Sequence, residues 1–154
     1  MIGAFLVCQS FVVAFIALHD WIPLGSLNNV SGVRSVDSRS RLVLVTVLST
    51  LPFAAGLAGS AWYASARFPM WLVWLLWITY GTAIYGMLRA WYVPYLLVEE
   101  PDRIARYQTM FAGTHTFLPR RNGIAPNTIH AIFHLILMAT AVLLVVLTYH
   151  RLFG

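Results

Sequence analysis

Two histidines four residues apart, His130 and His134, lie in the segment "PNTIHAIFH", directly before a long apolar stretch. On an α-helix they share one face, where two imidazoles can reach one metal ion or exchange protons with one ligand. A Zn or Fe ion would need at least a third ligand, and no spacing selects one. The candidates for that ligand are His19, Asp20, Glu99 and His115. The alternative is that both histidines only bond to loop carbonyl groups.

Arg89 is the one charged residue inside another long apolar stretch. An arginine at the centre of a bilayer costs about 2.5–3.5 kcal/mol on insertion scales, so it needs a partner or must reach the lipid headgroups. Asp20 or Glu99 could pair with it, or it could bind an anionic head group. Tyr85 and Tyr92 lie four residues before it and three after it, on the same helix face, where they could bond to it or line a pocket.

The composition indicates an integral membrane protein. The chain has 154 residues, of which 60% are hydrophobic and 10% are charged, and its mean hydropathy is +0.75. Soluble domains carry about 25% charged residues. The net charge of +5 has no basic cluster denser than Arg120-Arg121, which argues against a nucleic-acid partner. The single cysteine, Cys8, excludes an intramolecular disulfide and a Cys-rich metal site.

Four apolar segments are each close to the roughly 20 residues that cross a bilayer core. They cover residues 2–18, 42–64, 70–98 and 129–149. The first has neither a positively charged start nor an A-x-A cleavage pattern, so we expect a retained span rather than a signal peptide. Spans of this kind must satisfy their backbone polar groups internally. The sequence therefore predicts an all-α fold, a single domain over residues 1–154 with a bundle of four transmembrane helices.

The connection between the third and fourth spans predicts a further, amphipathic helix. Apolar residues recur at helical intervals after Pro101, which suits a first helical position. We expect a short interfacial helix over residues 101–113, ended by Gly113 and lying on the membrane surface. His115 would then lie close to the bundle, and Asn127 would cap the fourth span.

The arginines predict the orientation of the chain. Seven of them fall on one side of the predicted spans: Arg34, Arg39, Arg41, Arg103, Arg106, Arg120 and Arg121. Only Arg67 and Arg151 fall on the other side. The positive-inside bias makes the first side cytoplasmic and places both termini outside. His19-Asp20 and most of the other histidines and acids also fall on the cytoplasmic side, so we expect a polar cup at that interface.

Three stretches resemble motifs of a family of small bacterial four-helix membrane proteins with no established activity. They are "HDWIPLG", "RAWYVPYL" and "FLPRRNGIAPNTIHAIFH". The resemblance covers most of the chain. It implies the topology and a place in the bacterial cytoplasmic membrane, and it implies no catalytic role for any residue.

Two classes of function follow from these patterns. The first is a membrane enzyme or binding protein that acts on a lipid-like, isoprenoid or quinone molecule at the cytoplasmic interface. His130 or His134 would be its acid or base, Asp20 or Glu99 the partner, and Arg89 the anchor for an anionic group. The second is a non-catalytic accessory subunit that packs on a membrane-protein partner or on a second copy. A transporter would need a polar path through the bundle, which the sequence does not show.

Overall fold

The fold of the chain is helical, as predicted. The computed structural model describes residues 1–153, with side chains as far as His150, so that Arg151 lies outside the described side chains. Apart from one isolated bridge between Arg121 and Ile124, the described residues form helices joined by turns and loops.

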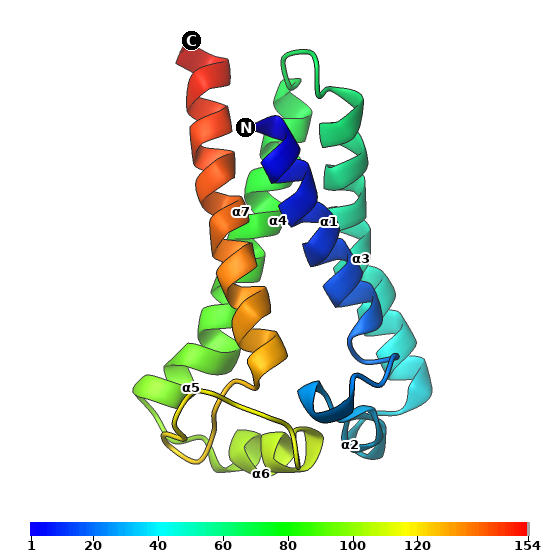
Figure 1. Ribbon diagram of the computed structural model, residues 1–154, viewed down its shortest axis with the longest axis vertical. Coiled ribbons are helices and arrows are strands. Elements are labelled where there is room, and N and C mark those ends of the chain that lie inside the picture. Colours follow the sequence, from blue (N-terminus) through cyan, green and yellow to red (C-terminus); the bar gives the residue numbers. More distant parts are fainter. Residues whose placement is uncertain (154) are drawn as a thin grey trace.

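Four long helical segments run side by side along the molecule (Figure 1). They are α1 (Ile2–Leu18), α3 (Arg39–Trp62), α7 (Thr128–Phe153), and α4 (Met70–Met87) continued by the π-helical η2 (Leu88–Tyr92) and by α5 (Val93–Leu96). The shorter helices are η1 (Gly25–Leu27), α2 (Val30–Val36) and α6 (Pro101–Met110). Figure 1 shows α2, α5 and α6 at one end of the bundle and both chain termini at the other.

Three of these segments are long and apolar enough to cross a membrane. They are Arg39–Trp62, Met70–Leu96 and Thr128–His150. The fourth, α1, is apolar but has only 17 residues. Large apolar side chains on the outer face of α3, such as Leu44, Leu48 and Leu51, are more than half exposed. A lipid environment accounts for that exposure, because it removes the cost of leaving apolar side chains in water.

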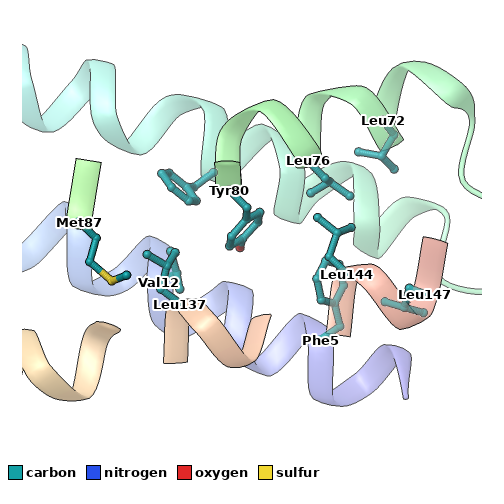
Figure 2. Close-up of a cluster of buried hydrophobic side chains, with 10 residues drawn as sticks. Phe5, Val12, Leu72, Leu76, Tyr80, Met87, Leu137, Leu144 and Leu147 are labelled. Atoms are coloured by element: carbon teal, nitrogen blue, oxygen red, sulfur yellow. The ribbon is translucent and has the colours of Figure 1, made fainter. Parts of the chain in front are cut away.

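The four segments pack as a closed ring in which α1 and α4 each contact both α3 and α7. Buried apolar side chains from all four fill the centre (Figure 2). Glycines let α3 approach α4 closely. A Cβ on Gly56 would lie 2.9 Å from the Leu76 side chain, and one on Gly59 would lie 2.7 Å from Leu72. Small residues at such contacts are typical of helices packed in membranes.

The π-helical segment η2 is joined to α6 through one backbone carbonyl group. Residue 94 is a proline, so it cannot donate the helical hydrogen bond that the carbonyl of Ala90 would otherwise receive. The Tyr107 hydroxyl donates to this carbonyl over 3.1 Å, and Arg103 Nη1 donates to it over 3.4 Å. Both donors come from α6. The carbonyl that Pro94 leaves without its helical donor therefore connects η2 to α6.

The predicted helix after Pro101 is present as α6, with the proline in its first turn. It ends at Met110, three residues before Gly113, which has a positive φ of 71° in the following turn. Helix α6 packs on α2, where a Cβ on Gly32 would lie 2.6 Å from the carbonyl oxygen of Thr109. An ion pair between Asp37 and Arg106 joins the same two regions. The connection between α1 and α3 and the connection between α5 and α7 therefore contact each other at this end of the bundle.

Candidate functional site

His19 and Asp20 form a pair at the end of α1. His19 is the residue that follows the helix, and its Nδ1 atom lies 2.8 Å from the carbonyl oxygen of Phe15, one turn earlier. Its other ring nitrogen, Nε2, lies 3.2 Å from Oδ1 of Asp20. The side chains are 17% and 27% exposed, respectively, so the pair is largely shielded yet reachable from outside.

The geometry of this pair favours a proton between the two side chains. A carbonyl oxygen can only accept, so Nδ1 of His19 carries a hydrogen and donates to Phe15. In the neutral ring, Nε2 would then present a lone pair to the Asp20 carboxylate, which is repulsive. A proton on Nε2 or on Oδ1 removes this repulsion. His19 and Asp20 thus form a pair that can share one proton.

The pKa of Asp20 is shifted in the direction that a proton-holding group requires. Burial raises it above the ordinary value of 3.8, because a charged carboxylate loses hydration there. The neighbouring His19 opposes this rise, and the negative charge of Asp37 adds to it. Asp20 therefore takes up a proton more readily than an exposed aspartate does.

Asn28 fixes the loop that carries this pair. Its Nδ2 donates to the carbonyl oxygens of His19 over 2.6 Å and of Ile22 over 2.8 Å. Its Oδ1 accepts from the backbone N–H of Leu24 over 2.7 Å. Three backbone groups of one turn are therefore held by one side chain, which limits the positions open to Asp20.

His130 lies in an enclosure of rings that we call the His130 enclosure. The centre of its imidazole lies 5.0–5.5 Å from four of these rings and 6.3 Å from a fifth. The five rings are those of Phe15, His19, Trp91, Phe111 and His134. They come from α1 and its end, η2, the turn after α6, and α7. His130 therefore stands where α1, η2, α7 and the turn after α6 meet.

Asn127 fixes the tautomer of His130. As predicted, Asn127 caps α7, and its Oδ1 accepts from the backbone N–H of His130 over 3.1 Å. The same oxygen lies 2.6 Å from Nδ1 of His130. Asn127 Nδ2 donates to the carbonyl oxygen of Leu27, which settles the orientation of the amide. Nδ1 of His130 is therefore the donor, and Nε2 is the acceptor in the neutral ring.

His134 is one turn further into α7 and is 3% exposed. Its Nδ1 atom has no hydrogen-bond partner in the described part of the chain. The residue lines a pocket of about 240 Å³ together with Tyr92 and apolar residues of α4, η2 and α7. Its ring centre lies 5.5 Å from that of Tyr92. Of the two expectations for Tyr92, a bond to Arg89 or a place in a pocket wall, the structure shows the second, beside His134.

An apolar groove of about 310 Å³ lies between α1 and α7, and His19 is one of its lining residues. Phe11, Leu18 and Ile132 line it, and all three are more than a third exposed. Ile22 and Leu24, from the loop after α1, extend the same apolar lining and are exposed as well. Apart from His19, no lining residue carries a polar side chain.

Arg89 belongs to a separate group of charges. Its Nη1 lies 2.6 Å from Oε1 of Glu100, and Arg103 Nε lies 2.7 Å from the other oxygen of the same carboxylate. The expected pairing of Arg89 with Asp20 or Glu99 is therefore wrong. Arg89 is the second residue of the π-helical segment η2, and Glu100, the residue before α6, reaches it rather than Glu99.

The hydrogen bonds from Arg103 and Arg89 hold the pKa of the Glu100 carboxyl below its ordinary value of 4.5. Glu100 therefore stays negative and bridges the two arginines. The predicted convergence of Arg89 with His130 and His134 on one polar cup is not what the structure shows. One part is the Arg89–Glu100–Arg103 bridge, and the other is the His130 enclosure with the His19–Asp20 pair.

Three other predicted site residues lie outside both parts. Tyr85 is 71% exposed on the outer face of α4. Glu99 is exposed and forms no ion pair in the described part of the chain. His115, which was expected close to the bundle, lies in the loop after α6; its Nδ1 is 2.7 Å from Oγ1 of Thr128, the first residue of α7, and its backbone N–H donates to the carbonyl oxygen of Ser26. His115 therefore joins the two connections of the site end and has no place in the enclosure.

The metal hypothesis lacks the third ligand that it required. Within the described residues, no group of three or more His, Cys, Asp or Glu side chains is placed to hold a metal ion. One nitrogen of His130 is also occupied by Asn127. The arrangement suits proton exchange better than metal binding.

Several residues of the site were missed from the sequence. Phe15, Trp91 and Phe111 form most of the His130 enclosure, and Asn127 was assigned only as a helix cap. The spacing of Phe15 and His19, one helical turn apart, was a usable signal for the first of them. No protein-family model, curated protein or solved structure matches this chain, so its function must be inferred from this geometry.

Proposed function

We propose that this chain is a membrane protein that takes an amphipathic, lipid-like molecule, such as an isoprenoid, a quinone or a lipid, from the bilayer. The apolar chain of the ligand lies in the groove between α1 and α7, and its polar head meets His19 and Asp20. The observation that carries the proposal is that His19, one of the residues that line this groove, lies 3.2 Å from the Asp20 carboxylate.

The shape of the groove supports an elongated apolar ligand. Apolar side chains that line it, such as Leu18 and Ile132, are exposed. An apolar ligand that covers them gains about 25 cal/mol of binding free energy per Å² of apolar surface buried. Pockets for small molecules combine such a lining with a few placed polar groups. Here His19 is the one lining residue with a polar side chain, which suits a molecule with one polar group on an otherwise apolar body.

The chemistry of the pair supports proton exchange with the ligand head. Histidine changes its charge close to neutral pH, and a carboxylate within hydrogen-bonding distance stores or returns the proton. The neutral ring of His130, fixed by Asn127, lies edge-on to His19 with 5.4 Å between ring centres and forms the inner wall. His130 is therefore a positioning residue in this proposal, and His19 with Asp20 is the proton-exchanging group.

In this proposal α1 crosses the membrane in addition to the three longer segments, and α6 lies on the membrane surface. The closed ring of four helices supports the crossing of α1, because α1 packs against both α3 and α7, which are long enough to cross the membrane. The arginine distribution supports a cytoplasmic location for the site end, in a bacterial cytoplasmic membrane with both termini outside. The site then opens at the inner headgroup level.

Photolabelling with an isoprenoid alcohol that carries a diazirine group tests the groove. We expect labelling of the protein in mild detergent at peptides of α1 and α7. Ala14→Trp fills the groove, because Ala14 lines it and is exposed, and should abolish most of this labelling. Val7→Trp is the matched control, since Val7 is 70% exposed on the same helix and does not line the groove.

Equal labelling of both variants at these peptides would remove the groove from the proposal. The protein would then be better described as an accessory subunit. Exposed aromatic side chains at the end of the bundle opposite the site, Trp62 at 84% and Trp71 at 56%, favour that second function. Co-purification of one defined membrane protein at a fixed ratio, lost in Trp62→Ala, would support it.

A further inference from the structure

A second cleft, of about 350 Å³, lies at the start of the span α3. It is formed by the loop after α1, by α2 and by the first turn of α3. Its lining residues are Trp21, Arg34, Asp37, Arg39 and Leu42. Trp21 is held in place by a hydrogen bond from its Nε1 to Oγ1 of Thr46 over 3.0 Å. The cleft therefore has a fixed aromatic wall, and it is separate from the groove that His19 lines.

The charge of this cleft is positive. Its one acid, Asp37, is already paired with Arg106 and lies 3.3 Å from Nη1 of Arg41. Among the side chains that the structure describes, neither Arg34 nor Arg39 forms an ion pair. Two arginines that line the cleft are therefore without an ion-pair partner among the described side chains.

The two arginines differ in how they are held. The guanidinium carbon of Arg34 lies 6.0 Å from the centre of the Trp21 ring, a separation at which the cation is attracted to the ring. Arg39 is the first residue of α3, where the unpaired backbone N–H groups add positive potential. Guanidinium groups bind phosphate through paired hydrogen bonds. The cleft therefore suits a phosphate group.

The position of the cleft indicates where this phosphate comes from. Leu42 lines it, and the next three residues of α3, Val43, Leu44 and Val45, are each about half exposed and apolar. They begin the outer face of a segment able to cross the membrane. A phosphate at the level of Arg39 thus has an apolar surface directly beside it for acyl chains. Figure 1 shows α2 and the start of α3 at the same end of the bundle.

We propose that this cleft binds the phosphate headgroup of an anionic phospholipid. Arg34 and Arg39 hold the phosphate, the Trp21 ring covers one side of the headgroup, and the acyl chains lie along the exposed apolar side chains of α3 from Val43 onwards. The site is independent of the proposed function, because it shares no lining residue with the groove at His19.

Native mass spectrometry of the full chain in mild detergent tests this site. Phosphatidylglycerol and the zwitterionic phosphatidylcholine are added in competition, and the fraction of protein that carries each lipid is measured. We expect phosphatidylglycerol to be retained preferentially. Arg34→Gln and Arg39→Gln should each weaken its retention about fivefold, which corresponds to about 1 kcal/mol for an arginine at a membrane surface.

Arg120→Gln is the control for overall charge. It removes the same charge from an exposed residue of the other connection on the same side of the spans, outside the cleft. An equal loss with Arg120→Gln would overturn the proposal, because binding would then follow net charge. The thermal midpoint of each variant in lipid-free detergent separates loss of binding from loss of fold, and Arg39→Gln, at an exposed helix start, provides a second independent variant.

A further comparison distinguishes a lipid from a soluble ligand. The same cleft could hold free phosphate, so the thermal midpoint is measured with inorganic phosphate and with phosphatidylglycerol. We expect stabilisation by the lipid that is lost in Arg34→Gln, and none by inorganic phosphate at the same concentration. Equal, Arg34-dependent stabilisation by both would show a soluble phosphate site and would contradict the assignment to a lipid.

Discussion

The imidazole of His19 lies edge-on to that of His130, with 5.4 Å between the ring centres, although one follows α1 and the other belongs to α7. Two positively charged imidazoles at this separation would repel each other. Only His19 has a carboxylate beside it, and only His130 has an amide oxygen that fixes one neutral tautomer. The two rings therefore have different surroundings, and in the proposed function the exchanged proton lies on the side of His19.

The first prediction concerns this proton. Spectra of the protein with ¹⁵N-labelled histidine, assigned through His19→Gln, should show both ring nitrogens of His19 protonated or hydrogen-bonded at neutral pH. Asp20→Asn should shift the Nε2 signal, because the shared proton is lost. Asp102→Asn, an exposed acid in the first turn of α6, should leave it unchanged. A lone-pair signal for Nε2 in the wild-type protein would contradict the shared proton.

The second prediction compares two adjacent acids. Glu100 lies within 2.7 Å of nitrogens of both Arg89 and Arg103, whereas Glu99 forms no ion pair in the described part of the chain. Glu100→Gln should therefore lower the thermal midpoint at neutral pH, and Glu99→Gln should leave it nearly unchanged. The measurement is thermal unfolding of both variants and the wild type in one detergent.

The pH dependence of this difference has a definite sign. Because the pKa of Glu100 is lower in the folded protein than its ordinary value of 4.5, its stabilisation is present above pH 4.5 and is lost as the pH falls through the folded value. The gap between the two variants should therefore close in acid. A gap that stays constant down to acid pH would mean that packing, not charge, causes it.

The helical elements were predictable because lipid imposes a strong pattern. The first apolar segment was predicted over residues 2–18, and α1 has those bounds. The cap at Asn127 and the proline that starts α6 were also predictable, since both depend on local hydrogen bonding. Helix α1 is apolar but shorter than the three segments that are long enough to cross a membrane, so the total of four spans remains a prediction.

The site was less predictable because it depends on how helices turn against each other. Arg89 and the histidines share a depth in the sequence, but the π-helical turn directs Arg89 towards Glu100 and Trp91 towards His130. That turn accompanies Pro94, whose effect on neighbouring side-chain directions is not visible in residue spacing. The positions of these residues along the predicted spans therefore suggested one polar cup. The structure instead has the Arg89–Glu100–Arg103 bridge and, apart from it, the His130 enclosure with the His19–Asp20 pair.

The third prediction concerns Asn127, which is 1% exposed and serves both α7 and His130. Asn127→Ala should cost about 2–4 kcal/mol of unfolding free energy, because a cap is lost and buried polar groups lose their partner. Ser38→Ala removes the exposed cap of α3 and should cost about 1 kcal/mol or less. Unfolding in mixed detergent micelles measures both, and equal costs would argue against a buried role for Asn127.

The last prediction concerns orientation, which decides on which side of the membrane the site opens. Ser35 in α2 and Ser65 in the turn between α3 and α4 are both exposed, at opposite ends of α3. With Cys8 replaced, a cysteine at position 35 should be protected from a membrane-impermeant thiol reagent in intact cells, and one at position 65 should react. The physical reason is the excess of arginine at the end that carries Ser35.

Lysed cells provide the control for this experiment, because both cysteines should react once the membrane is open. Labelling of position 35 alone in intact cells would reverse the orientation and place the His19–Asp20 pair on the outer side. Labelling of both in intact cells would show that Arg39–Trp62 does not cross the membrane. Either result would move the proton exchange proposed for His19 and Asp20 away from the cytoplasm, whereas the expected pattern places it at the inner headgroup level, where Arg34 and Arg39 would meet anionic lipids.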